Sequence, residues 1–195
     1  MQPETISAKE LAARWCYAEL SSSRFACSYS LPASDPLRDK AKSSTRFSSL
    51  SDEEVERLRC SLESHPDRGP SFYPLLMGFD FYRREAWEYS QLSDVSLAPG
   101  LGWSRFLDFE GAGLIGEPRI KVHETLATIP VGEFIQAEPV IIVPCRYKGQ
   151  RFHLLLEGTL RSLLFARDRT DATRLQVWMP VAAVPVELNT GPSWL

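Results

Sequence analysis

Residues 138–179 constrain the fold of this chain more than any other segment. Two apolar runs, residues 140–143 and 152–156, flank Lys148-Gly149, a dipeptide that favours a two-residue turn between antiparallel strands. A turn at this place predicts the cross-strand pairs Cys145 with Phe152, Val143 with Leu154, Ile142 with Leu155 and Ile141 with Leu156. Because both faces of this hairpin are apolar, we expect it to lie inside a sheet that is covered on both sides.

A helix and a third strand are predicted after the hairpin. The second strand ends at residues 157–161, Glu-Gly-Thr-Leu-Arg, and the following residues carry the broad apolar face of a helix: Leu160, Leu163, Leu164 and Phe165. Residues 171–173 are a polar break, and residues 175–179 have the composition of a strand. The predicted order is therefore β-turn-β-α-β.

The junction between the second strand and this helix is the candidate binding site. Gly158 allows the backbone to approach a ligand closely, and the first N–H groups of a helix attract anions. Thr159 can cap the helix or hydrogen-bond a phosphate, and Arg161 can reach back to the anion as a planar fork. We expect a phosphate-bearing ligand at Gly158, Thr159 and Arg161.

This pattern resembles the ParB/sulfiredoxin superfamily, in which an x-Pro-Ile/Val-x-Val strand, a hairpin, an acidic-Gly-x-x-Arg turn, a helix and a strand follow one another. The strand matches residues 139–143 and the turn matches residues 157–161, so the resemblance covers about a fifth of the chain. It implies a turn that holds nucleotide phosphates. Leu160 stands where the family has His or a second Arg, and Thr159 stands where sulfiredoxins have cysteine. Sulfiredoxin chemistry is therefore not expected.

The resemblance implies a nucleotide- or phosphate-ligand-binding protein, with ATP or CTP and Mg²⁺ as the expected ligands. A reaction at this turn would be phosphoryl transfer or nucleotide hydrolysis, which depends mainly on electrostatic positioning. Glu157, at the end of the strand, can act as a base or bind a metal ion. His123 and Glu124, in a predicted strand over residues 119–125, are further catalytic candidates because that strand would border the turn.

Two other functions stay open. A non-catalytic protein–protein interaction protein, of a regulatory or immunity type, is compatible with the scattered histidines and the lack of a second catalytic motif. A DNA-binding accessory protein is compatible with the seven Lys/Arg and three acidic residues between positions 145 and 175. The net charge of −3 does not favour nucleic-acid binding by the whole chain.

The first half of the chain is predicted to be helical. Ser7 and Ser51 each stand three residues before a Glu, which is the spacing of a capping box. The two helices should end near Leu20 and before Pro66, with His65 interacting with the helix dipole. The Ser-rich residues 21–50 are predicted to be a loop. Residues 81–92 are predicted to be helical, in a region rich in aromatic side chains: Phe72, Tyr73, Phe79, Phe81, Tyr82, Trp87 and Tyr89. These aromatics are expected to build the core, with base stacking or peptide binding as the alternative.

The predicted fold class is therefore α+β, with a mixed β-sheet. An N-terminal helical, aromatic-rich layer occupies residues 1–98 and includes the loop of residues 21–50. The ParB/sulfiredoxin-like β-β-α-β core occupies residues 99–195. Residues 111–116 have the spacing of a dinucleotide-binding loop, but Glu117-Pro118 prevents the required helix.

Cysteine and histidine usage indicates no metal site. The four cysteines are scattered without a Cys-x-x-Cys pair, which suggests free thiols in a reducing compartment. Cys145 and His153 are a weak candidate for a Cys/His nucleophile, because both lie within apolar strands. No signal peptide and no apolar run of membrane-spanning length are visible, so a cytoplasmic, soluble protein is expected.

Overall fold

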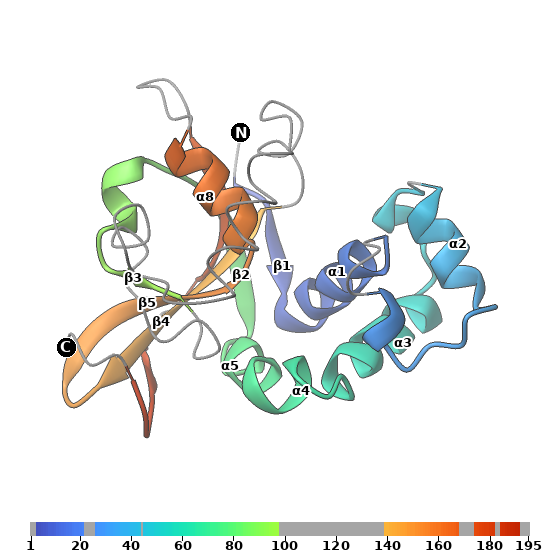
Figure 1. The fold of residues 1–195 in the computed structure, drawn as a ribbon, viewed down its shortest axis with the longest axis horizontal. Coiled ribbons are helices and arrows are strands. Elements are labelled where there is room, and N and C mark those ends of the chain that lie inside the picture. The colour runs from blue at the N-terminus through green and yellow to red at the C-terminus, as the bar shows by residue number, and fades with distance from the viewer. Residues whose placement is uncertain are drawn as a thin grey trace. The chain divides into compact units, whose positions relative to one another are not determined.

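The computed structural model of the chain describes residues 3–21, 26–43, 45–97, 139–167, 174–181 and 184–191. Within these ranges the protein is α+β, with N-terminal helices followed by strands of a mixed seven-stranded sheet (Figure 1). The predicted class and the mixed sheet are confirmed. The chain divides into two compact units. The helical unit is Thr5–Tyr82, and the sheet unit is Arg83–Leu195 together with Met1–Glu4. The predicted boundary at residues 98 and 99 lies outside the described residues and stays a prediction.

The helical unit is built around one central helix, α1 (Ala8–Leu20). Helix α1 contacts α2 (Pro36–Lys42), α3 (Asp52–Glu63) and α5 (Tyr73–Met77), and the one-turn helix α4 (Arg68–Ser71) precedes α5. Both predicted helix starts are confirmed. The Ser7 hydroxyl accepts from the Glu10 N–H at 3.1 Å, and Ser51 and Glu54 form a complete capping box with bonds of 3.3 and 3.0 Å.

The prediction that residues 21–50 form a loop is wrong for much of the segment. Helix α2 begins after Asp35, whose side chain accepts from the Leu37 N–H at 3.0 Å, and two short 3₁₀ helices, Ala26–Ser28 and Phe47–Ser49, flank it. The buried Arg38 guanidinium donates to four backbone carbonyls of the preceding segment: Ala26, Tyr29, Leu31 and Pro32. Because polar side chains order this segment, hydrophobic periodicity does not reveal it.

His65 does not interact with the dipole of α3 as predicted. Its side chain is only 3% exposed, and Nδ1 accepts from the backbone N–H groups of Asp67 and Arg68, both at 3.1 Å. A nitrogen that accepts two hydrogen bonds carries no proton, so the ring is neutral. Burial lowers the pKa of His65, which agrees with a neutral ring. His65 therefore caps the short helix α4.

The predicted helix over residues 81–92 is also wrong. This segment is strand β2 (Phe81–Trp87) followed by the 3₁₀ helix Tyr89–Leu92. Its Arg and Glu residues favour a helix, but pairing in the sheet overrides that preference. No single aromatic cluster is found among the described residues. Phe72 packs on Trp15 in the helical unit, whereas Trp87 contacts His153 in the sheet unit.

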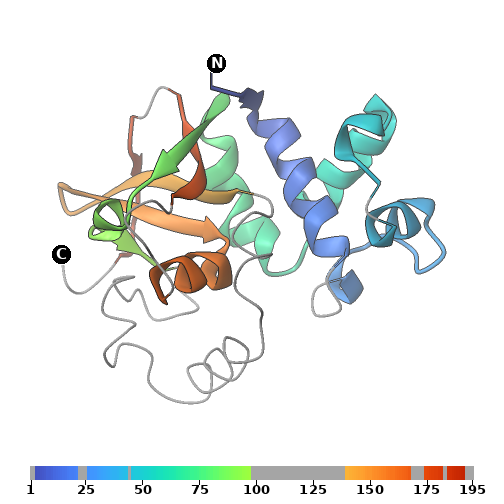
Figure 2. The same cartoon turned by 90° about the horizontal axis from the view of Figure 1, so that it is seen from above.

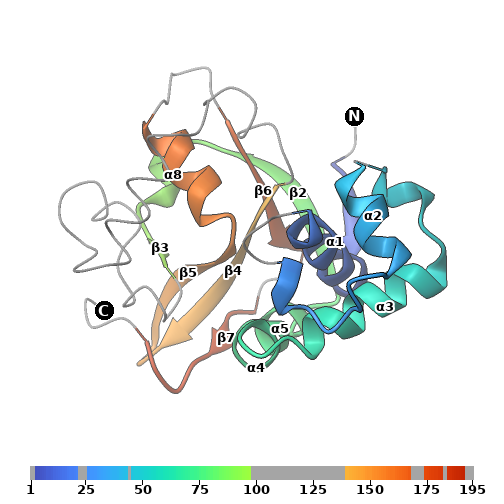
Figure 3. The same cartoon turned by 45° about the vertical axis from the view of Figure 1, so that its right-hand side comes forward.

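The sheet has the order β1-β2-β6-β4-β5-β3, and β7 also pairs with β4. The remaining strands are β1 (Thr5–Ser7), β3 (Val95–Ser96), β4 (Val140–Tyr147), β5 (Gln150–Glu157), β6 (Leu175–Pro180) and β7 (Val186–Glu187). Strand β4 is antiparallel to β5 and parallel to both β6 and β7. Figure 3 shows β6 and β7 along the same side of β4, with β5 on the other side.

The β4–β5 hairpin has most of its predicted register. Lys148 and Gly149 have φ values of 50° and 79°, the two positive angles that a type I′ turn needs. The predicted pairs of Cys145 with Phe152, Val143 with Leu154 and Ile142 with Leu155 are confirmed. A register shift then places Ile141 opposite Glu157 instead of Leu156. This irregularity lies at the end of β5, where the candidate turn begins.

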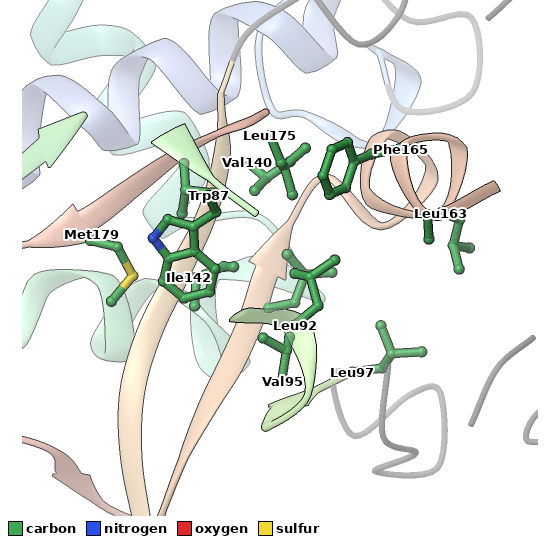
Figure 4. Close-up of a cluster of buried hydrophobic side chains, with 13 residues drawn as sticks. Trp87, Leu92, Val95, Leu97, Val140, Ile142, Leu163, Phe165, Leu175 and Met179 are labelled. Atoms are coloured by element: carbon green, nitrogen blue, oxygen red, sulfur yellow. The ribbon is translucent and has the colours of Figure 1, made fainter. Parts of the chain in front are cut away.

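Helix α8 (Thr159–Arg167) follows this turn and lies along one face of the hairpin (Figure 2). A buried apolar cluster fills the space between the helix and the strands (Figure 4). Leu163 and Phe165 come from α8, and they meet Ile142 of β4 and Leu155 of β5 in this cluster. The cluster anchors the start of α8 against the sheet and so positions the turn.

Candidate functional site

The backbone of the β5–α8 turn requires a glycine. Gly158 has a φ of 96°, and a Cβ at this position would lie 2.4 Å from Cγ1 of Val140. The Gly158 carbonyl accepts from the Ser162 N–H at 2.9 Å, which is the first hydrogen bond of α8. Thr159 is therefore the first residue inside the helix and not its cap. The early N–H groups of α8 lie directly after a residue that has no side chain.

The turn brings two of the predicted site residues into direct contact. Nη2 of Arg161, in the first turn of α8, forms an ion pair with Oε2 of Glu157 at the end of β5. Their side chains are only 13% and 22% exposed, so water screens this pair weakly. The predicted phosphate ligand Arg161 and the predicted base Glu157 are thus already partners. An anion at this turn has to share the guanidinium with the carboxylate.

Two polar atoms in the first turn of α8 have no hydrogen-bond partner in the described part of the chain. They are Nε of Arg161 and Oγ of Ser162, and both atoms are buried. Ser162 itself is completely buried. A buried polar group without a partner costs about 1–3 kcal/mol, so the first turn of α8 contains polar groups that the described fold leaves incompletely paired. Nothing in the sequence distinguishes Ser162 from other serines, and its importance follows from burial beside Arg161.

The other predicted site residues divide into two groups. Glu157, Gly158, Thr159 and Arg161 lie together at the β5–α8 turn, and Thr159 is half-buried there. His123, Glu124 and the glycines of residues 111–116 lie outside the described residues. Their proximity to the turn stays a prediction.

The sequence did not predict the pairing of His153 with the carboxylate of Asp94. Nδ1 of His153 lies 3.0 Å from Oδ2 of Asp94, and the His153 N–H donates to the Asp94 carbonyl at 3.1 Å. The Trp87 ring packs edge-on against the imidazole, with centroids 5.5 Å apart. The hydrogen bond to His153 lowers the pKa of Asp94. The two partners are 59 positions apart, so only the parallel pairing of β3 with β5 reveals them.

The cysteines form no reactive pair with a histidine in the described residues. All four thiols are free, and burial raises the pKa of the Cys145 thiol to about 12. Cys145 pairs with Phe152, whereas His153 pairs with Pro144, so Cys145 and His153 point to opposite faces of the hairpin. The weak Cys/His nucleophile is therefore excluded.

Three further findings concern metal binding, membrane spans and similarity to other proteins. No group of three or more side chains able to bind a metal ion comes together in the part of the chain that the structure describes. None of the helices described is both long enough and apolar enough to cross a membrane. Comparison with family models, with curated proteins and with solved structures returned no match.

Proposed function

We propose that this protein binds a phosphate-bearing ligand, a nucleotide, at the β5–α8 turn. The observation that carries the proposal is the Arg161 guanidinium beside the start of α8. This group is 13% exposed, and its buried Nε has no hydrogen-bond partner among the described residues. A guanidinium with an unused donor at the start of a helix can bind two oxygens of a phosphate through parallel N–H···O hydrogen bonds.

The neighbouring residues have complementary roles in this proposal. Gly158 gives the turn the positive φ that it needs, and the Thr159 hydroxyl and the first N–H groups of α8 offer further donors. These proposed roles of Gly158, Thr159 and Arg161 are the ones that the resemblance to the ParB/sulfiredoxin superfamily implies. The buried Ser162 hydroxyl adds a donor that the resemblance does not include.

The carboxylate of Glu157 makes nucleotide binding depend on Mg²⁺ in this proposal. A free nucleotide competes with the Glu157 carboxylate for Arg161, and the two like charges repel each other. A Mg²⁺ complex of ATP or CTP removes much of this repulsion, because Mg²⁺ binds carboxylates and phosphates together. A reaction at this turn would be phosphoryl transfer or nucleotide hydrolysis. In such a reaction Glu157 would act as a base or metal ligand, with His123 and Glu124 as further candidates.

The test uses two variants that remove the same ion pair. Arg161→Gln removes the cation, whereas Glu157→Gln removes its competitor, so both lose the pair but change the charge of the turn in opposite directions. We would measure thermal melting with a panel of nucleotides, with and without Mg²⁺. A ligand at 100 times its Kd stabilises a protein by about 2.7 kcal/mol. We expect this stabilisation in the wild type, its loss in Arg161→Gln, and a smaller requirement for Mg²⁺ in Glu157→Gln.

The variants also show what would contradict the proposal. Equal responses to nucleotide in Arg161→Gln and in the wild type would exclude Arg161 as a ligand contact. A panel without any stabilisation would leave the turn as part of the helix start. That outcome would favour the alternative of a non-catalytic interaction protein, for which a protein partner has to be sought.

A further inference from the structure

The outer end of the β4–β5 hairpin carries an unfavourable pair of like charges. Arg146 and Arg151 lie directly opposite each other in the register. Like charges at directly opposed positions destabilise a sheet, and a negatively charged group beside this pair would reduce the repulsion. Nη1 of Arg146 bonds Oε1 of Glu187 on β7 at 2.7 Å. Arg151 is exposed, and no ion pair joins it to another residue in the described ranges.

His153 lies on the same face of the hairpin as these two arginines. The next pair on that face is Pro144 with His153, because side chains alternate along each strand. Arg151 and His153 are therefore neighbours on one face of β5, about 7 Å apart along the strand. The register shift of the hairpin lies farther along, at Ile141 and Ile142, so this part of the register is regular.

The imidazole of His153 is held in one orientation. Asp94 holds Nδ1 at 3.0 Å, and the edge-on Trp87 ring packs against the imidazole. The side chain remains 28% exposed. With Nδ1 engaged by the carboxylate, Nε2 is the nitrogen left for a ligand. Nε2 adds a third nitrogen donor beside the two arginines only when the ring carries both protons, because a neutral ring that donates through Nδ1 accepts at Nε2.

We propose that this face of the hairpin is a second anion site, where Arg146, Arg151 and His153 bind a phosphate monoester. Two guanidinium groups supply the planar forks that bind phosphate oxygens, and the protonated imidazole supplies a third donor. A dianionic monoester also neutralises the repulsion between the two arginines. The site shares no residue with the β5–α8 turn and stands independently of the function proposed there.

The charges around the proposed site nearly balance before a ligand binds. Asp94 and Glu187 contribute two negative charges, against the two positive charges of Arg146 and Arg151. Trp87 Nε1 donates to the Glu85 carboxylate at 3.1 Å, and Glu85 is itself paired with Arg83. Glu187 is therefore the carboxylate that competes with a phosphate for Arg146.

Lys148 provides a matched control on the same hairpin. Its ammonium group lies over the Tyr147 ring, 5.0 Å from the centroid. Tyr147 follows Arg146 along β4, so its side chain points to the opposite face. Lys148→Gln and Arg151→Gln each remove one exposed positive charge from the hairpin, but only Arg151→Gln changes the proposed site.

The experiment follows the imidazole signals of the full chain by NMR while phenyl phosphate is added at one constant pH. His153→Gln identifies the His153 signal among those of the three histidines. We expect the His153 signal to shift as phenyl phosphate binds. Arg151→Gln should weaken binding about tenfold, as expected for one charge-assisted hydrogen bond. Lys148→Gln and Arg161→Gln should change it less than twofold.

Three outcomes would overturn the proposal. Equal weakening by Lys148→Gln and Arg151→Gln would show general attraction of anions to the hairpin. Loss of the response in Arg161→Gln alone would assign phosphate binding to the β5–α8 turn. Binding of an oligonucleotide without terminal phosphates, in the absence of any phenyl phosphate binding, would identify a phosphodiester ligand instead. Tighter binding in Glu187→Gln, which releases Arg146, would support the proposal.

Discussion

The two units of this protein treat charge in opposite ways. The helical unit buries charged and titratable side chains, with Glu19, Asp35, Arg38 and His65 all less than 9% exposed. The buried polar side chains described in the sheet unit are the uncharged Ser96 and Ser162. Its charged side chains are more exposed, and they include those at the turn and at the outer end of the hairpin.

This difference separates charges that maintain the fold from charges that remain for ligands. Glu19 accepts hydrogen bonds from Tyr29 and from Arg68, so its carboxylate joins separate segments of the helical unit. Removing one partner of such a pair leaves a buried charge uncompensated. In the sheet unit, apolar packing maintains the fold, so we expect the arginines at the outer end of the hairpin to be replaceable without a large cost in stability.

The largest expected effect is the loss of the buried carboxylate in Glu19→Gln. This substitution leaves Arg68 without its ion pair in a site where the carboxylate is 5% exposed. We expect the free energy of unfolding to fall by about 3 kcal/mol, measured by urea denaturation. The matched control is Glu10→Gln in the same helix, which loses an exposed pair with Arg14 and should cost about 0.5 kcal/mol or less. Similar losses in the two variants would remove the contrast between buried and exposed charges.

A smaller effect is expected at the candidate turn, where geometry and not charge is limiting. Gly158→Ala adds a Cβ to a residue with positive φ and against Val140, so we expect a loss of about 2–3 kcal/mol. Gly149 also has positive φ, but a Cβ there meets no atom within 4 Å. Gly149→Ala should therefore cost only about 1 kcal/mol. Thermal melting of both variants measures the difference, and equal losses would show that contact with Val140 is unimportant.

The acid stability of the protein should depend on the helical unit through His65. Burial lowers the pKa of His65 in the folded state, whereas the unfolded chain takes up this proton near pH 6.5. Stability is therefore unaffected by this group above about pH 6.5 and falls as the pH drops below that value. Urea midpoints between pH 8 and pH 5 measure the fall. His65→Asn keeps an acceptor for the N–H groups of Asp67 and Arg68 but does not titrate. An unchanged pH dependence in this variant would assign the fall to other groups.

The smallest expected effect is a gain in stability at the hairpin. Arg151→Thr removes the repulsion with Arg146 and introduces a residue that favours strands. We expect an increase of about 0.5 kcal/mol in the free energy of unfolding. The same variant should bind phenyl phosphate more weakly than the wild type. A loss of stability would show that Arg151 has a structural role that the register does not explain.

The sequence predicts local structure well where the local signals agree with the tertiary structure. The turn at Lys148-Gly149 sets the hairpin register, and the Ser7 and Ser51 caps set the starts of α1 and α3. Each signal lies within a few residues of the structure that it determines. The register shift at Ile141 could not be predicted, because it arises where β4 also pairs with β6.

Features that depend on distant residues were missed or misassigned. Arg38 orders the segment before α2 through carbonyl groups 6 to 12 residues away. The sequence of strand β2 favours a helix, and only its pairing in the sheet shows that it is a strand. At the candidate turn, the sequence places Glu157, Gly158 and Arg161 together, but it does not show that Arg161 is already paired. The pairing of Asp94 with His153 could not be predicted, because the two residues are 59 positions apart in the sequence.

The division of the chain has a consequence for the order in which the protein is made. Along the sequence, the helical unit is inserted between two segments of the sheet unit. The two ends of the helical unit are close together, because the Ala8 N–H donates to the Asp80 carbonyl at 2.9 Å. All of this unit has left the ribosome once residue 82 has emerged. Strand β4, in contrast, has to wait for its partners in β6 and β7, at residues 175–187, which are translated much later than residue 82. The helical unit can therefore fold during synthesis before the sheet is complete.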